Sequence, residues 1–429
     1  MNRCYVSEVT PDKTVHVSGF VENLRNKRAM AFLVLRDITG KIQVTIEKEA
    51  YPEVAQKIDM LTLGSVIAIK GKAVANEHVK LNGIEILPEE LVVYSVSDAF
   101  PIKEDSSIDL RMDYRWLDLR TERNQLIFKV QTSIANSFRQ LLLNNKFIEI
   151  HTPKLISTAS ESGSDVFELD YFDQKAYLAQ SPQFYKQMAM SAGFERVFEC
   201  GSVFRAEKSH TNKHSTEFTG FDLEMSFIES FYDIMQIEEK MMIQMLETLK
   251  SLYGDEIKNL FGIEIIVPTS PFPIMTLKEV YKELEERYSY IVPPNEQGDL
   301  TTEAEHLCEK LSLDKFGHEF LFITEYGADS RAFYHMRDDN GVPLGYDLIW
   351  KGVEITTGAQ REHRYEILKA QADEKGLGKD VEHYLEFFRY GCPPHGGFGM
   401  GLDRITMLAL DIPIKEVMFL FRGPNRLTP

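Results

Sequence analysis

The sequence has few cysteines and no long apolar run. Its four cysteines are far apart, and no two form a Cys-x-x-Cys pair, so there is no sign of a disulfide framework or of a zinc ligand set. No segment approaches the roughly 18 apolar residues that a membrane-spanning helix requires, and the N-terminal residues lack the apolar centre of a signal peptide. We therefore expect a soluble, cytoplasmic protein with no membrane partner.

Positive charge is also scarce. The chain has 48 Lys and Arg against 66 Asp and Glu, a net charge of -18 that by itself argues against a polyanionic partner such as nucleic acid. The acidity is uneven, however, because residues 1–100 contain 12 basic and 13 acidic side chains. Arg25, Lys27 and Arg28 cluster within that stretch, so a local basic face can form there.

Length and composition predict a globular protein of two or more domains. A chain of 429 residues exceeds the size of a single core, and 43% hydrophobic with 27% charged residues excludes the fibrous and disordered classes. In the first hundred residues the pattern predicts five strands, at 15–21, 31–35, 42–46, 66–73 and 91–94, and one helix, at 51–63. This is the order of an OB-type barrel, which binds single-stranded nucleic acid on exposed aromatics. A generic β-barrel interaction module is the alternative.

The remainder of the chain predicts an α+β domain. Residues 101–124 are polar and broken, as in a linker or hinge between domains. An amphipathic helix follows at 125–145, and then a strand at 147–150. Several later strands follow one another without a crossover helix, which favours an antiparallel sheet flanked by helices. The predicted domains are therefore 1–100 and 125–429, joined by the linker.

Two segments carry residues suited to phosphate chemistry, FRAEK from Phe204 and GFGMGLDR from Gly397. Arg205 lies at the base of a predicted hairpin, where its planar guanidinium suits phosphate oxygens. In the second segment the glycines precede a helix and let the backbone approach a ligand, with Arg404 in the first helical turn. For each segment alone, a solvated hairpin or a close contact between helix and sheet is the structural alternative.

Together, in this order and spacing, these segments resemble the second and third motifs of the class II aminoacyl-tRNA synthetases, closest to the aspartyl enzymes of the archaeal and eukaryotic type. The helix at 125–145 with the strand through Pro153 resembles the first motif, which builds the dimer interface of this class. The resemblance covers essentially the whole chain. It implies an OB-fold anticodon-binding domain, a class II catalytic domain and a homodimer, with ATP, Mg²⁺, L-aspartate and tRNA(Asp) as ligands and substrates.

Such a ligase activates its amino acid with ATP and then transfers it to a tRNA hydroxyl. The amino-acid carboxylate attacks the α-phosphate and pyrophosphate leaves, a step that depends on positioning and charge stabilisation. The resemblance implies that Arg205 contacts the α-phosphate and Arg404 the γ-phosphate, as the catalytic pair, and that Phe218 stacks on the adenine. The other implied nucleotide contacts are Ala206, Glu207, Lys213, His214, Ser215, Glu354, Gly401, Leu402 and Asp403.

A magnesium site is implied at Asp347, Glu354 and Thr357, since Mg²⁺ prefers hard oxygen ligands. Asp347 and Glu354 are seven residues apart on what the pattern predicts to be one strand and its continuation. Strict alternation would place them on opposite faces, so a bulge is needed if both bind metal. The family commonly has serine at the position of Thr357, and the hydroxyl is kept. Solvated carboxylates are the alternative.

The side-chain carboxylate of aspartate calls for a pocket with fixed cations. The resemblance gives this role to Lys186 and Arg361, and the asparaginyl branch typically has an apolar residue in place of Lys186. Glu161 and Asp222 match positions associated with the substrate ammonium, and Gln183 matches one that orients the substrate. If Lys186 were an ordinary surface lysine, the aspartate prediction would depend on Arg361 alone. The full implied set is Glu161, Gln183, Lys186, Arg205, Asp222, Thr357 and Arg361.

On the OB domain, Phe32 and Gln43 match the family's stacking aromatic and its reader of the middle anticodon base, with Arg25 as a further contact. Core or edge packing is the alternative for the aromatic. Some family members charge only tRNA(Asp), and others also charge tRNA(Asn). The difference depends on how the protein contacts the last anticodon base, near Glu22 and the loop 73–83. Because Glu22 is not the residue expected in strict enzymes, we expect relaxed specificity that includes tRNA(Asn).

Three other functions fit parts of the pattern. An asparagine-tRNA ligase is separated from this chain by Lys186. A non-catalytic OB-fold paralogue that binds RNA would have lost Arg205, Glu354 or Arg404, and all three are present. A relative that makes free asparagine would lack the anticodon domain, which this chain has.

Overall fold

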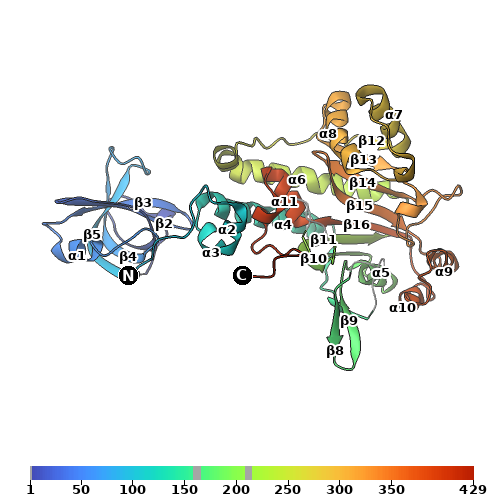
Figure 1. The fold of residues 1–429 in the computed structure, drawn as a ribbon, viewed down its shortest axis with the longest axis horizontal. Coiled ribbons are helices and arrows are strands. Elements are labelled where there is room, and N and C mark those ends of the chain that lie inside the picture. Colours follow the sequence, from blue (N-terminus) through green and yellow to red (C-terminus); the bar gives the residue numbers. More distant parts are fainter. Residues whose placement is uncertain (1, 158–165, 208–214) are drawn as a thin grey trace. The chain divides into compact units, whose positions relative to one another are not determined.

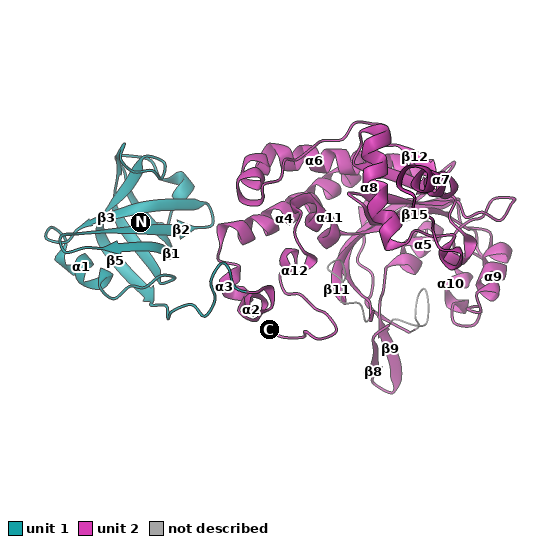
Figure 2. Cartoon of the chain, turned by 45° about the horizontal axis from the view of Figure 1, so that its top comes forward, with its two compact units in different colours: residues 1–106 teal, residues 107–429 magenta. Residues whose placement is uncertain are grey.

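The structure is a computed structural model that describes residues 2–157, 166–207 and 215–429. The chain folds into two compact units, Met1–Ser106 and Ser107–Pro429 (Figure 2). Within the described residues, no helix is both long enough and apolar enough to cross a membrane.

The first unit is a closed barrel of five strands in the order β1-β2-β3-β5-β4 (Figure 1). Alternate side chains point inward, and Val17, Leu33, Val44 and Ile69 are fully buried in its core. The predicted order of three strands, a helix and two strands is confirmed. The elements are η1 (Val6–Glu8), β1 (Thr14–Asn26), β2 (Met30–Asp37), β3 (Gly40–Glu47), α1 (Pro52–Ile58), β4 (Val66–Ala75) and β5 (Ile84–Ser95).

Three elements of the barrel differ most from their predicted ranges, and strand β1 is one of them, since it continues to Asn26 rather than ending at residue 21. Helix α1 is shorter than 51–63, because Pro52 at its first position sets the start and the chain turns at Asp59. Strand β5 begins well before residue 91. The sequence did not indicate this earlier part of the strand, because Pro88 and its acidic neighbours obscure the alternating pattern. Gly71 pairs with Pro88 and Lys70 with Glu90, so a bulge accommodates the proline.

The second unit is built on a sheet of eight strands among the described residues, in the order β12-β13-β14-β15-β16-β11-β10-β6 (Figure 1). The six central strands pair antiparallel, as predicted, whereas the edge strands β12 and β6 pair parallel with their neighbours. Parallel pairing is available at these edges because long connections separate the paired strands. The strands are β6 (Ile148–Glu149), β10 (Arg196–Phe204), β11 (Glu217–Ser226), β12 (Ile274–Thr276), β13 (Phe320–Thr324), β14 (Gly345–Trp350), β15 (Val353–Arg361) and β16 (His395–Gly401).

Helices α4 (Glu122–Asn144) and α6 (Tyr232–Phe261) pack together over one face of this sheet. The Thr121 side chain accepts a hydrogen bond from the Asn124 N–H and caps the start of α4. The predicted apolar stripe of α4 is buried, and Phe138 packs edge-on against Phe221 of β11. Because alternate residues of β11 point to opposite faces, Asp222 and Glu224 point away from these helices.

The remaining elements surround the sheet. Within the predicted linker 101–124 the structure has two short helices and the start of α4. A separate three-stranded sheet has the order β7-β9-β8. The other elements are α2 (Ile108–Asp113), α3 (Arg115–Asp118), β7 (Leu155–Ile156), β8 (Glu168–Tyr171), β9 (Gln174–Leu178), α5 (Gln183–Ser191), α7 (Leu277–Tyr288), η2 (Pro294–Glu296), α8 (Thr302–Phe316), η3 (Ala328–Ser330), α9 (Tyr365–Glu374), α10 (Glu382–Glu386), α11 (Leu402–Leu410) and α12 (Ile414–Val417).

Candidate functional site

A cavity of about 330 Å³ lies on the sheet face that carries Asp222. Most of the sequence-predicted residues that the structure describes gather around it. Among the residues predicted for the catalytic domain, four described ones do not line it, namely Lys186, Ala206, Asp347 and Leu402. The predicted residues Glu161, Lys213 and His214 lie outside the described residues. The predicted residues that line the cavity are Gln183, Arg205, Glu207, Ser215, Phe218, Asp222, Glu354, Thr357, Arg361, Gly401, Asp403 and Arg404.

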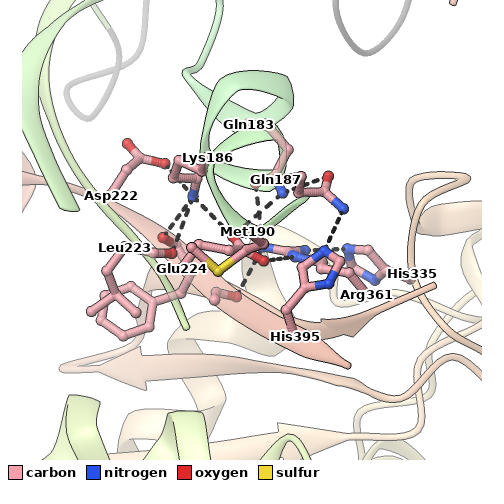
Figure 3. Close-up of polar contacts among 12 residues, drawn as sticks. Gln183, Lys186, Gln187, Met190, Asp222, Leu223, Glu224, His335, Arg361 and His395 are labelled. Carbon is pink, nitrogen blue, oxygen red and sulfur yellow. Dashed lines mark hydrogen bonds and ion pairs between the residues drawn. The ribbon is translucent and has the colours of Figure 1, made fainter. Parts of the chain in front are cut away.

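Lys186 is fully buried on α5, so the alternative of an ordinary surface lysine is wrong. Its Nζ donates to Asp222 Oδ1 at 2.9 Å and to the backbone carbonyls of Phe398 at 3.1 Å and Leu223 at 3.3 Å (Figure 3). Asp222 lines the cavity and Lys186 does not, so the ammonium group contacts Asp222 from the side away from the cavity.

Arg361 is the second predicted cation, and a buried carboxylate links it to the first. Arg361 Nε donates to Glu224 Oε1 at 3.0 Å, and Lys186 Nζ lies 3.6 Å from Glu224 Oε2 (Figure 3). Burial alone would raise the pKa of Glu224, but Arg361 and Lys186 outweigh it and hold that pKa below its ordinary value. Glu224 is therefore an anion that neutralises part of the charge of both cations.

His335 lies against the same arginine. Its Nε2 is 3.2 Å from Arg361 Nη1, which can only donate, so the ring proton is on Nδ1. Burial, together with the charge of Arg361, holds the pKa of His335 well below its ordinary value, and the ring is neutral at pH 7. A neutral histidine leaves the charge of Arg361 available to the cavity.

The glycine-rich segment before α11 is a central strand, β16. Its glycines face crowded neighbours. A Cβ at Gly397 would lie 2.0 Å from the Leu223 carbonyl oxygen, and one at Gly399 would lie 2.7 Å from Asp222 Oδ1. The absent side chains thus make room for the carboxylates of β11 and for the cavity.

Arg205 follows directly after β10, beside Phe218 of β11. Its guanidinium carbon is 5.5 Å from the centre of the Phe218 ring, and its Nη1 is 3.7 Å from Glu207 Oε1. The Arg205 side chain is 44% exposed, so it can turn toward a ligand without breaking a buried contact. An aromatic ring and a cation therefore lie together in the lining of the cavity.

Asp403 and Arg404 lie in the first turn of helix α11 and line the cavity. Arg404 Nη1 donates to the backbone carbonyl of Glu354 at 2.8 Å. The two carboxylate oxygens of Asp403 accept hydrogen bonds from the Thr219 N–H and from Gln131 Nε2, each at 2.8 Å. Asp403 thus ties α11 to β11 and to α4, and Arg404 is held over the loop end of β15.

Asp347 and Glu354 do not lie on one strand, contrary to the sequence prediction. They lie on the antiparallel neighbours β14 and β15, which the tight turn at Lys351 and Gly352 joins. Asp347 pairs with Thr357, and Ile349 pairs with Glu354, so one extra residue forms a bulge in β15. The bulge brings Glu354 to the face of Thr357, whose Oγ1 donates to Glu354 Oε1 at 2.9 Å.

The oxygen groups of these strands suit a hard cation. Asp347 is buried, and its Oδ1 has no hydrogen-bond partner among the described residues. Burial raises the pKa of Asp347 to about 6, although Arg331 opposes the rise. Across residues 2–157, 166–207 and 215–429, no three His, Cys, Asp or Glu side chains gather closely enough to hold a metal ion on their own. The donor set fits Mg²⁺ that brings further oxygen ligands with it.

The barrel unit has a second cavity, of about 730 Å³, on the outer face of β1, β2 and β3. Arg25, Phe32 and Gln43 line it, and Arg25 pairs with Phe32 across the strands. Gln43 Nε2 donates to Thr45 Oγ1 at 3.0 Å and to Glu85 Oε2 at 3.1 Å. Because both amide hydrogens are used, Gln43 presents its carbonyl oxygen to a ligand.

Several residues of these sites were not predicted from the sequence, and His335 is one of them. Glu224 had a visible signal, since it lies two residues after Asp222 and shares its strand face. Arg331 and Glu85 had none, because each reaches its partner from a segment distant in the sequence.

Comparison with known proteins gives matches along nearly the whole chain. A family model described as tRNA synthetases class II (D, K and N) matches residues 107–422, and one described as an OB-fold nucleic acid binding domain matches residues 15–94. The chain is 41% identical to a Methanopyrus kandleri protein named aspartate-tRNA(Asp/Asn) ligase, over 99% of both chains. It is 40% identical to a Pyrococcus abyssi protein named aspartate-tRNA(Asp) ligase, again over 99% of both.

A solved structure of asparaginyl-tRNA synthetase from Pyrococcus horikoshii, complexed with asparaginyl-adenylate, is also similar. Its TM-score is 0.91 and its sequence identity 32%, over 100% of both chains.

Proposed function

Because the chain belongs to the class II tRNA synthetases of the D, K and N group, we propose that it joins L-aspartate to tRNA(Asp) at the expense of ATP. The chain is an aminoacyl-tRNA synthetase, and the two relatives described above carry aspartate in their names.

The pair of buried cations beside the cavity is the observation that supports aspartate over asparagine. Lys186 and Arg361 contribute two positive charges, and Asp222 and Glu224 contribute two negative ones. A carboxylate side chain gains from Arg361 and from the ammonium behind Asp222, whereas an amide carries no charge to pair with them.

The residues around the cavity can carry out activation by binding and orientation. Arg361 and Asp222 would hold the two ends of the amino acid, and Gln183 would orient it. Arg205 would meet the α-phosphate as the carboxylate attacks, while Phe218 stacks on the adenine. Arg404 would hold the γ-phosphate at the far end of the triphosphate. Fixed donors of this kind stabilise charge that develops in the transition state.

Asp347, Glu354 and Thr357 would hold the Mg²⁺ that accompanies ATP. Bound there, the ion would supply charge neutralisation at the phosphate oxygens. The orphaned Oδ1 of Asp347 and the paired oxygens of Glu354 and Thr357 support this assignment. In the protein itself, Arg404 is already oriented toward the Glu354 backbone, so nucleotide and metal would share one wall of the cavity.

The barrel would bind the anticodon, with a base stacked on Phe32 and contacted by Gln43 and Arg25.

We also propose a homodimer formed through α4 and β6. Leu143 and Ile148 are exposed apolar residues at this edge of the sheet, which supports such an interface.

Relaxed tRNA specificity is part of the proposal. Glu22 is held by Arg36 Nε and Lys41 Nζ, each at 2.7 Å, so its carboxylate is neutralised rather than directed at a base. The name of the Methanopyrus kandleri relative also includes both tRNAs. Transcripts of tRNA(Asp) and tRNA(Asn), incubated with the enzyme, ATP and labelled aspartate, should both acquire label. Label on tRNA(Asp) alone would overturn the relaxed specificity, and label on neither would overturn the proposed function.

A further inference from the structure

Asp347 is already neutralised by a cation of the chain itself. Arg331 Nη2 donates to Asp347 Oδ2 at 2.6 Å, and both side chains are almost completely buried. Arg331 also lines the cavity, whereas Asp347 does not. The guanidinium therefore stands between the carboxylate and the space that the nucleotide would occupy.

The arginine is held in this place from several sides. Its guanidinium lies 3.7 Å from the centre of the Tyr326 ring. The preceding turn, η3, is tied to the chain at Gly298, because Ser330 Oγ donates to the Gly298 carbonyl at 3.0 Å and the Gly327 N–H donates to it at 2.9 Å. Because Arg331 is fixed in this way, its ion pair with Asp347 is a defined structural contact and not a chance pairing on the surface.

The other oxygen ligands are too few to displace this cation without help. Glu354 accepts from Thr357, and no three acidic, histidine or cysteine side chains cluster in the part of the chain that the structure describes. Magnesium gives up its water reluctantly and is typically bound by one or two carboxylates together with substrate phosphates. A triphosphate would supply the missing ligands and would also offer Arg331 an alternative anion.

We propose that Arg331 takes the place of the metal in the free enzyme. The guanidinium of Arg331 pairs with Asp347 and releases it only when the divalent ion arrives with a nucleotide. The proposal rests on the proposed function in one respect, that ATP and Mg²⁺ come to this cavity. Arg331 is a positioning residue in this account. It keeps the two carboxylates from binding a divalent ion alone, and after release it can pair with the phosphates.

The test is a Mn²⁺ titration of the full chain, followed by the paramagnetic resonance signal of the free ion, with and without a non-hydrolysable ATP analogue. Wild-type protein should bind Mn²⁺ weakly until the analogue is added. Arg331→Gln should bind Mn²⁺ without the analogue at least about tenfold more tightly than wild type, because a competing cation is gone. With the analogue present, the two proteins should agree within about threefold.

Two further variants make the result specific. Arg331→Gln combined with Asp347→Asn should lose the gain, and Arg337→Gln, which removes an arginine paired with the exposed Glu374, should match wild type. Tight Mn²⁺ binding by wild type alone would overturn the proposal whether or not Arg331→Gln folds. An unchanged affinity in Arg331→Gln, or a gain that persists without Asp347, would overturn it too. Neither aspartate nor tRNA enters the titration, so its failure is distinct from a failure to charge tRNA.

Discussion

Among single residues, the two cations proposed to select aspartate share a carboxylate partner that the resemblance did not identify. Lys186 and Arg361 were predicted from the sequence, but their shared partner Glu224 was not. The reason is physical: the three residues come from α5, β11 and β15, and only the folded sheet brings their charges together. Residue type and spacing can suggest a cation, whereas its orientation depends on partners that are distant in the sequence.

Glu238 carries the clearest pH dependence in the protein. It is fully buried on α6, and Tyr346 donates its hydroxyl to Glu238 Oε2 at 2.7 Å. Burial raises its pKa from 4.5 to about 7. A raised folded-state pKa means that the native state holds a proton which the unfolded chain releases. The resulting stability is therefore complete below about pH 4.5 and is lost as the pH rises through about 7.

We predict that wild type loses up to about 3 kcal/mol relative to Glu238→Gln between about pH 5 and pH 8. Both tryptophans, Trp116 and Trp350, lie in the second unit, so their fluorescence during guanidinium unfolding reports on that unit. Glu247→Gln, an exposed change on the same helix, is the control and should follow wild type over this range. A stability difference between wild type and Glu238→Gln that does not vary with pH would contradict the prediction.

At the element scale, the sequence predicted which helices and strands form better than it predicted how strands meet. The apolar stripe of α4 and the antiparallel central sheet were visible as periodicity and as strand succession. The hairpin between β14 and β15 was not, because continuous β-branched and polar residues conceal the turn at Lys351 and Gly352. The glycines of β16 gave no strand signal, because glycine is typical of turns, and here the missing side chains avoid clashes with the backbone and side chains of neighbouring strands.

The close packing around the glycines of β16 predicts the effect of adding one methyl group. Gly397→Ala should destabilise the second unit by about 1 to 3 kcal/mol or prevent its folding, because its Cβ would meet the Leu223 carbonyl oxygen at 2.0 Å. Gly254→Ala on α6 is the matched control, since the nearest atom to its Cβ is Lys250 Cγ at 3.8 Å. It should be neutral or stabilising by up to about 1 kcal/mol. Tryptophan fluorescence during denaturant unfolding compares the two, and equal stabilities would refute the packing argument.

In the whole molecule, the negative charge is unevenly distributed between the two regions to which we assign different tasks. The net charge of -18 belongs almost entirely to residues after 100, and the barrel unit has a near-neutral balance with a basic cluster at its first strand connection. An acidic total therefore did not exclude RNA as a partner. Binding of tRNA is expected to depend on local contacts and not on a general positive field.

This division of tasks predicts that an anticodon variant separates the two steps of the reaction. Phe32→Ala should raise the KM for tRNA by roughly 5-fold to 150-fold, because stacking contributes about 1 to 3 kcal/mol per base. Aspartate-dependent pyrophosphate exchange should stay at the wild-type rate, since that step occurs in the second unit. Tyr94→Ala, which removes an exposed aromatic of the same barrel away from the cavity, is the control. A fall in pyrophosphate exchange, or an unchanged KM for tRNA, would go against this division.

Pyrophosphate exchange with aspartate and with asparagine, side by side and without tRNA, shows whether the buried cations Lys186 and Arg361 select aspartate for activation. We predict exchange with aspartate and almost none with asparagine. Lys186→Leu should lower the aspartate rate by roughly 30-fold to several thousand-fold, since losing a buried charge partner costs about 2 to 5 kcal/mol. Lys250→Leu, an exposed change on α6, should leave the rate unchanged. Exchange driven equally well by asparagine, or a near-normal aspartate rate in Lys186→Leu, would contradict the account.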